Sequence, residues 1–223
     1  MNTAARYKKI LLTGLVLLVL FAAWTVAVVT VDVAPIGPEN SEVGFSGINK
    51  AFHELTGLNR SVYKLTDLLE WLPLGVCGLL ALLGLVQWVR RKNLLKVDAD
   101  LLALGVYLII VLAAWLLFDK LALNYRPEMV EGIMEPSYPS STTLLIVSVI
   151  PAIVLQINRR IPQGTLQTVL KIAAAVFGAF IVIGRLLCGV HWITDIIGGL
   201  LLGFGLFFVL YGVTLKLDGK KEE

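Results

Sequence analysis

The sequence predicts an all-α membrane protein, in which six transmembrane helices form a bundle and an amphipathic interfacial segment joins the first two. Of the 223 residues, 57% are hydrophobic and only 16% are charged. The mean hydropathy of +0.84 lies far above that of soluble domains. Six apolar runs recur along the chain, each close to the roughly 20 residues that a helix needs to cross a bilayer. The length suits one domain, and we expect residues 1–223 to form it.

The six apolar runs differ in how strongly they predict a helix. The first follows Arg6, Lys8 and Lys9 as a signal peptide would, but it continues far enough to span a membrane. The fourth opens with hydroxyl side chains and contains Pro151, so it is the weakest of the six predictions. The runs lie near residues 10–31, 72–89, 99–118, 139–157, 166–187 and 193–215.

Basic residues indicate which side of the membrane each connection faces. Six spans place both termini on one side, together with the second and fourth connections. Thirteen of the 19 Lys and Arg residues, Lys220 and Lys221 among them, fall on that side, and six fall on the other. Because basic residues concentrate on the cytoplasmic side, we expect both termini in the cytoplasm of a bacterial cell and the other three connections outside.

The first outer connection, from about residue 32 to residue 71, is too long for a simple turn. It contains Val43, Phe45, Ile48, Phe52 and Leu55, whose spacing is typical of one apolar helical face. Such a helix is expected to lie in the membrane interface. A lid or an entry surface for a substrate is the functional alternative.

Polar and ionisable residues gather at the outer ends of the later spans. Because charged groups at membrane depth are costly, they usually mark a functional site. The predicted topology brings seven of them to one leaflet, from the end of the third span to the start of the sixth. They are Lys120, Arg126, Ser140, Ser141, Arg185, His191 and Asp195.

His191 and Asp195 are four residues apart and therefore share one helical face. The carboxylate can accept the proton of the nearer ring nitrogen, which leaves the other nitrogen free for nucleophilic attack. A purely structural pair at a helix start is the alternative. Arg185 favours the functional interpretation, because its planar guanidinium suits a two-pronged grip on phosphoryl oxygens.

With Arg185 included, residues 184–195 resemble the third signature of the type 2 phosphatidic acid phosphatase (PAP2) superfamily, Ser-Arg-x5-His-x3-Asp, with Gly184 in place of the serine. The first signature, Lys-x6-Arg-Pro, is similar to the stretch from Lys120 to Arg126 and Pro127, although only five residues intervene here. The second, Pro-Ser-Gly-His, is similar to residues 139–142, which read Pro-Ser-Ser-Thr. The core signatures therefore cover residues 120–195.

The resemblance implies a catalytic role for His191, Asp195 and Arg185, with His191 forming a phosphohistidine. It implies phosphate binding by Arg185 and by a second group of residues: Lys120, Arg126, Ser140, Ser141 and Thr142. Fixed cations would neutralise the phosphate, so we expect no metal and no cofactor. The family's second-signature histidine protonates the leaving group, and Thr142 cannot do so near neutral pH.

The missing histidine leaves the substrate open. A prenyl diphosphate such as undecaprenyl diphosphate is favoured, because a departing phosphate needs protonation less than an alkoxide does. Phosphatidic acid or phosphatidylglycerophosphate is the alternative. His53, the other of the two histidines, is a possible proton donor, as are the outer glutamates Glu128, Glu131 and Glu135.

A protein that binds or transports lipid phosphates without turnover is a further alternative, since two signatures are altered. A channel is less favoured, because the charges gather at one interface rather than along a path. The partners we expect are the lipid substrate and the surrounding membrane lipids, with no nucleic acid. The oligomeric state is left open.

Overall fold

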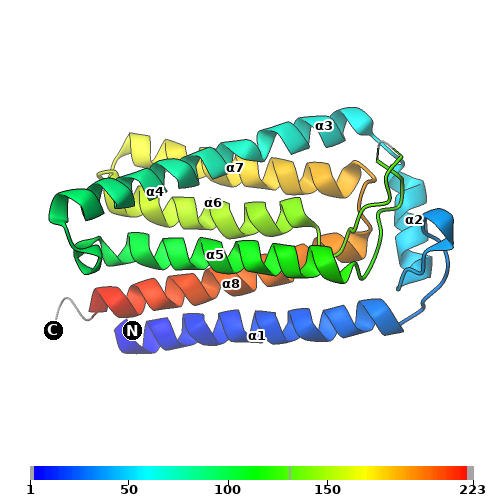
Figure 1. Cartoon of the computed structure of the whole chain (residues 1–223), viewed down its shortest axis with the longest axis horizontal. Helices are drawn as coiled ribbons and strands as arrows, with labels where there is room; N and C mark the ends of the chain where they lie inside the picture. Colours follow the sequence, from blue (N-terminus) through cyan, green and yellow to red (C-terminus); the bar gives the residue numbers. More distant parts are fainter. Residues whose placement is uncertain (1–2, 131, 220–223) are drawn as a thin grey trace.

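The computed structural model describes residues 3–130 and 132–219. Glu131, Lys220 and Lys221, used in the predictions above, lie outside the described residues, as do residues 1, 2, 222 and 223. The described part is built of helices (Figure 1). They are α1 (Thr3–Thr30), α2 (Ser46–Thr56), α3 (Arg60–Leu69), α4 (Trp71–Arg91), α5 (Ala99–Leu121), α6 (Ser141–Arg160), α7 (Thr165–Leu187) and α8 (Ile193–Gly219), with single 3₁₀ turns at Pro38–Asn40 and Leu94–Lys96.

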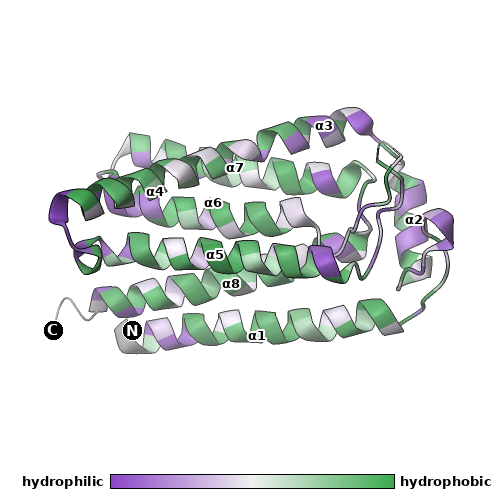
Figure 2. Cartoon of the chain, in the orientation of Figure 1, coloured by the Kyte–Doolittle hydropathy of each residue, from purple (hydrophilic) through white to green (hydrophobic). Residues whose placement is uncertain are grey.

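Six helical stretches are long and apolar enough to cross a membrane, as the sequence predicts. Five of them agree with the predicted runs to within a few residues at most ends. Figure 2 shows the same division: hydrophobic residues cover the long helices, and hydrophilic residues gather at the two ends of the bundle. The predicted fold class, a six-helix membrane bundle, is therefore confirmed.

The second span is longer than predicted, because it extends over Arg60–Arg91 and includes α3 as well as α4. The break between the two helices falls at Glu70. Pro73 explains its position, since a proline has no N–H to donate to the carbonyl of Leu69 and its ring crowds that carbonyl. The prediction of a span from residue 72 missed α3, whose residues are half polar.

The first connection contains the expected amphipathic helix, now placed at α2. Ile48 and Leu55 are exposed on it, while Asn49 is fully buried on the opposite face. The apolar face is shorter than predicted. Val43 is buried and forms a β-bridge with Ala34 instead of joining the helix. Phe45 directly precedes α2 and has a left-handed backbone conformation.

The packing of the bundle separates its two ends. α8 is the central helix: it packs most extensively against α1 and α6, less against α5, and only slightly against α7. α1 begins and α8 ends at one end of the bundle, whereas α2 and the loop between α5 and α6 lie at the other (Figure 1). The polar residues predicted to form the site lie at this second end, opposite the two termini, as the six-span topology requires.

Candidate active site

The turn between α7 and α8 carries His191 and is fixed from two directions. The backbone N–H of Ser140, at the start of α6, donates to the carbonyl oxygen of Asp195 at 3.0 Å. The indole Nε1 of Trp192 donates to the carbonyl of Tyr125 at 2.8 Å. The segments that carry the second and third signatures are thus bonded directly to one another.

Asp195 is fully buried, and its carboxylate both caps α8 and approaches His191. Its Oδ2 accepts the backbone N–H of Trp192 at 3.0 Å, which caps the start of α8. Asn124 donates to its Oδ1 at 3.5 Å. The same Oδ2 lies 3.6 Å from Nδ1 of His191, slightly beyond hydrogen-bond distance, so a small ring movement would complete the predicted pair.

A close backbone crossing holds the turn before His191. The N–H of Asn59 donates to the carbonyl of Cys188 at 2.9 Å. Gly189 follows with φ +73°, and a Cβ at this position would lie 1.9 Å from the carbonyl oxygen of Gly57. Only glycine fits here, because the linker between α2 and α3 runs directly over the turn.

Arg185 is almost completely buried, with 1% of its surface exposed. Its Nη2 donates to Oδ1 of Asp67 at 2.8 Å and lies 3.3 Å from Oε2 of Glu70. The ring of Tyr63 lies against the guanidinium, 4.9 Å from its centre. All three partners come from α3 and the residue that follows it. α3 is therefore part of the candidate site.

Arg126 approaches Tyr63 as well, from the loop between α5 and α6. Its Nη1 donates to the Tyr63 hydroxyl at 3.2 Å, and its guanidinium lies 5.6 Å from the ring centre. Its Nη2 pairs with Oε2 of Glu135 at 2.9 Å. Tyr63 thus contacts both guanidinium groups that the sequence assigns to phosphate binding.

His191 is buried beside these cations. Burial lowers the pKa of His191 below its usual value, and the charges of Arg126 and Arg185 act in the same direction. The carboxylate of Asp195 opposes the shift without cancelling it. The imidazole is therefore neutral at neutral pH, which is the form that can attack phosphorus.

Four buried nitrogens of these side chains have no hydrogen-bond partner among the described residues. They are Nε of Arg126, Nε of Arg185 and both ring nitrogens of His191. Buried polar groups are almost always paired, and guanidinium donors suit an oxyanion. This arrangement can therefore accept a phosphoryl group.

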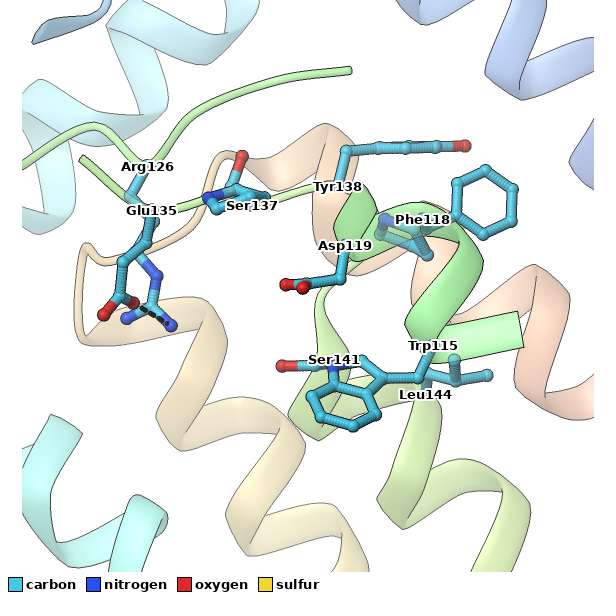
Figure 3. A pocket seen from close by; sticks show the side chains of 11 residues that line it. Trp115, Phe118, Asp119, Arg126, Glu135, Ser137, Tyr138, Ser141 and Leu144 are labelled. Carbon is cyan, nitrogen blue, oxygen red and sulfur yellow. Dashed lines mark ion pairs between the residues drawn. The ribbon is translucent and has the colours of Figure 1, made fainter. Parts of the chain in front are cut away.

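Two cavities meet at the start of α6. The first, of about 360 Å³ and here called the polar cavity because it is the more polar of the two, is lined about equally by polar and apolar surface. Its polar side chains include Asp119, Arg126, Glu135, Ser137 and Ser141. Figure 3 shows Asp119 and Ser141 pointing into the same space as the Arg126–Glu135 pair.

The second cavity, of about 460 Å³, is mostly apolar and lies between α4, α5 and α6. Its polar side chains, Glu70, Ser141 and Thr142, lie where these helices approach the candidate site, and its lining also includes Leu74, Leu108, Leu112 and Leu145. Trp115, Ser141 and Leu144 line both cavities. One cavity can hold a charged head group while the other holds a hydrocarbon chain.

The structure brings most of the predicted site residues together, but it does not place Lys120 among them. Lys120 is exposed on α5, and the cavity lining includes its neighbour Asp119 instead. Six residues separate position 119 from Arg126, as the family signature requires, so an aspartate occupies the lysine position. One residue turns a helix by about 100°, which explains why Lys120 faces elsewhere.

His53 lies apart from the two cavities. Its Nε2 is 3.6 Å from Glu128, and its ring packs edge-on against Trp192. It therefore contacts the neighbour of His191. Glu135 is the partner of Arg126. Across residues 3–130 and 132–219, no group of three or more His, Cys, Asp or Glu side chains could hold a metal ion.

Sequence reasoning missed Tyr63, Asp67 and Glu70. These residues recur at spacings of four and three, and with Thr66 they define one face of α3. This spacing in the sequence could have indicated that these residues share one helical face. The prediction missed it because the more apolar run that follows defined the second span.

Comparisons with known proteins agree with the family resemblance and with the fold. The model of the PAP2 superfamily matches residues 115–218. Phosphatidylglycerophosphatase B of Bacillus subtilis (strain 168) is 28% identical over 126 residues, which cover 53% of this chain and 62% of that protein, less than two thirds of its length.

A solved structure shows the same fold. It is the crystal structure of a transmembrane PAP2-type phosphatidylglycerolphosphate phosphatase from Bacillus subtilis, with a TM-score of 0.61 and 20% sequence identity. The match covers 92% of this chain and 97% of that one. The predicted core, residues 120–195, lies inside the range that the family model matches. The resemblance of this chain to the PAP2 superfamily, predicted from its three motifs, is thereby confirmed.

Proposed function

We propose that the chain is a membrane phosphatase that hydrolyses a lipid phosphate or diphosphate through a phosphohistidine. The observation that carries the proposal is the convergence of buried, unpartnered nitrogens from Arg126, Arg185 and His191. Nε2 of His191 forms the bond to the terminal phosphorus as the bond from that phosphorus to the leaving oxygen breaks. The leaving group is the lipid alcohol when the substrate is a monoester and the lipid monophosphate when it is a diphosphate. Water then hydrolyses the phosphohistidine, which releases inorganic phosphate and restores the neutral imidazole.

The surrounding groups stabilise charge in this reaction. Arg126 and Arg185 neutralise the phosphoryl oxygens. α6 begins at Ser141, and the side chain of its cap, Ser140, accepts the N–H of Thr143, which leaves the N–H groups of Ser141 and Thr142 to an anion. Asp195 orients the imidazole and stabilises its positive charge when His191 is phosphorylated.

Carboxylates occupy part of the space around the two guanidiniums. Asp67 and Glu70 pair with Arg185, and Glu135 pairs with Arg126. A phosphoryl group must share these cations with the carboxylates or displace them. We therefore expect binding of a lipid phosphate to move Glu135 and the end of α3.

The two cavities support a lipid substrate, because the apolar one opens between helices that cross the membrane. Two head groups have separate support. Thr142 in place of the family histidine favours a prenyl diphosphate, as argued above. The name of the Bacillus subtilis relative favours phosphatidylglycerophosphate. We retain the prenyl diphosphate as the first substrate to test.

The placement in the cell belongs to the same proposal. The bias of basic residues supports a topology with both termini in the cytoplasm and the candidate site at the outer face of a bacterial membrane. Residues 1–223 then form one catalytic domain that draws its substrate from the outer leaflet.

The test is phosphate release in detergent from undecaprenyl diphosphate, phosphatidylglycerophosphate and phosphatidic acid. Wild type should release phosphate, His191→Ala should not, and chelation of metals should leave the rate unchanged. His53→Gln is the matched control and should stay active. An acid-labile phosphoprotein should form in wild type alone. Binding of these lipids without phosphate release would instead favour the second candidate, a lipid-phosphate binding protein, for which the threonine at position 142 is the supporting observation.

A further inference from the structure

We propose that, when the substrate is a lipid phosphate monoester, Glu70 is the acid that protonates the departing lipid oxygen, in place of the histidine that Thr142 replaces. The inference rests on the proposed phosphatase function and adds a catalytic residue to it. Neither histidine of the chain is available for this step: His191 is the nucleophile, and His53 lies against Glu128 and Trp192.

The shape of the apolar cavity locates the leaving oxygen. In a lipid phosphate, this oxygen joins the hydrocarbon part to phosphorus, so it must lie where the apolar cavity meets the phosphate site. The polar side chains at that end are Glu70, Ser141 and Thr142. Among the described residues that line this cavity, Glu70 is the one carboxylic acid.

The contacts of Glu70 place it between this oxygen and the phosphate site. Its side chain lines the same cavity as the side chain of Thr142. Its Oε2 also lies 3.3 Å from Nη2 of Arg185. About a fifth of the Glu70 side chain is exposed, so the group is accessible from the cavity while most of its surface is covered.

A second departure from the family signatures allows this contact. Gly184 occupies the position of the signature serine, and a Cβ there would lie 2.6 Å from Cγ2 of Thr66 on α3. The glycine therefore lets α3 pack directly on α7. Asp67 and Glu70 follow Thr66 within about one turn, so this close packing brings both carboxylates to Arg185.

The balance of charge favours a proton on one carboxyl group once a substrate binds. Two guanidiniums, Arg126 and Arg185, face the carboxylates of Asp67, Glu70 and Glu135. A bound phosphoryl group adds further negative charge, and like charges held close together cannot all remain ionised. Asp67 has the shorter bond to Arg185, at 2.8 Å against 3.3 Å. Glu70 is thus the more weakly paired of the two.

The proton balance of the reaction is complete. As the bond from phosphorus to the lipid oxygen breaks, the carboxyl group of Glu70 gives its proton to that oxygen and the lipid alcohol departs. The resulting carboxylate accepts a proton from the water that attacks the phosphohistidine. Inorganic phosphate leaves, and Glu70 is protonated again for the next cycle.

Leaving-group basicity tests this role. Hexadecyl phosphate and 4-decylphenyl phosphate are both monoesters with a long apolar tail, but a phenolate leaves with far less need of a proton than an alkoxide. The comparison uses kcat/KM, which reports the steps up to departure of the alcohol or phenol and excludes the later hydrolysis of the phosphohistidine that both esters share. Glu70→Gln should lower kcat/KM for the alkyl ester by about 10²–10⁴-fold, the usual contribution of a general acid. It should lower kcat/KM for the aryl ester far less. Because both rates are measured on the same preparation, their ratio does not depend on the fraction of folded protein.

Two matched variants separate this role from neighbouring ones. Asp67→Asn removes the other partner of Arg185 and should lower both rates by a similar factor. Asp119→Asn, in the polar cavity, should behave in the same way. An equal loss on both esters for Glu70→Gln, or a selective loss of the alkyl ester for Asp119→Asn, would overturn the assignment to Glu70.

A rescue experiment provides a second readout. Adding Thr142→His to Glu70→Gln places an ionisable group at the end of the apolar cavity, and turnover of the alkyl ester should partly return. A purely structural role for Glu70 predicts no such recovery. Failure of the phosphatase proposal is distinguishable, because it would be seen as an inactive wild type or an active His191→Ala on both esters.

Discussion

Replacing Gly189 by alanine tests how closely the turn before α8 holds His191. Gly189 has a φ of +73°, and its Cβ would lie 1.9 Å from the carbonyl oxygen of Gly57. Left-handed backbone costs a residue with a Cβ about 1–2 kcal/mol. Real Cβ contacts essentially never fall below 3.0 Å, so the turn must also move away from the linker. A misplacement of about 1 Å at a reacting group can cost about 100-fold in rate. We therefore expect a loss of that order in kcat/KM.

Gly132→Ala is the matched control for the backbone term. Gly132 has a φ of +77°, but nothing lies within 4 Å of the Cβ that alanine would add. Both variants should lose a similar amount of stability to the left-handed conformation, whereas the clash is unique to Gly189. Phosphate release and thermal unfolding, measured together on both variants, separate displacement of His191 from loss of folded protein. If Gly189→Ala and Gly132→Ala release phosphate at the same rate, the argument that the clash displaces His191 is refuted.

Three further predictions concern the imidazole, α2 and α3. Because burial lowers the pKa of His191, kcat/KM should fall with acid only below the usual histidine value of about 6.5. The free energy of unfolding of wild type should also decrease as the pH drops from that value toward the lowered pKa, because the unfolded chain is protonated first. His191→Gln should remove this pH dependence. Asn49→Leu should lower the free energy of unfolding by about 1–3 kcal/mol, because Asn49 donates to the carbonyl of Gly44 at 2.8 Å and to Thr194 at 3.0 Å, whereas Lys50→Ala on the exposed face should change little. Gly184→Ser restores the signature residue yet should slow turnover, since its Cβ would push Thr66 and α3 away from Arg185; a faster variant would contradict the packing argument.

The spans were predictable because hydropathy adds up over many residues. A window of about 20 residues averages out single polar positions, so the six runs stand out even where Pro151 interrupts one of them. The ends of those runs then placed Arg126, Arg185 and His191 at one end of the bundle before any packing was known. For these residues, topology alone was sufficient.

The partners of Arg185 were not predictable in the same way. Asp67 and Glu70 are 118 and 115 residues away along the chain, and nothing in the local pattern links them to the arginine. In the sequence, α3 resembles an ordinary polar segment that precedes a transmembrane helix. Only the packing of α3 on α7 shows that this segment supplies side chains to the site. Lys120 lies away from the cavity for a different reason: a shift of one residue along a helix changes the face on which a side chain lies.

The departures from the family signatures fall in one region of space. Gly184 makes room for Thr66, and Thr142 lines the apolar cavity together with Glu70. Both changes therefore meet the same short helix, which carries the carboxylates that reach Arg185. If the signatures had simply decayed, altered positions would have no reason to contact one element that introduces an acidic group. The packing fits better with a site in which α3 supplies the chemistry that position 142 no longer provides, and this is why α3 and the signature positions should be varied together.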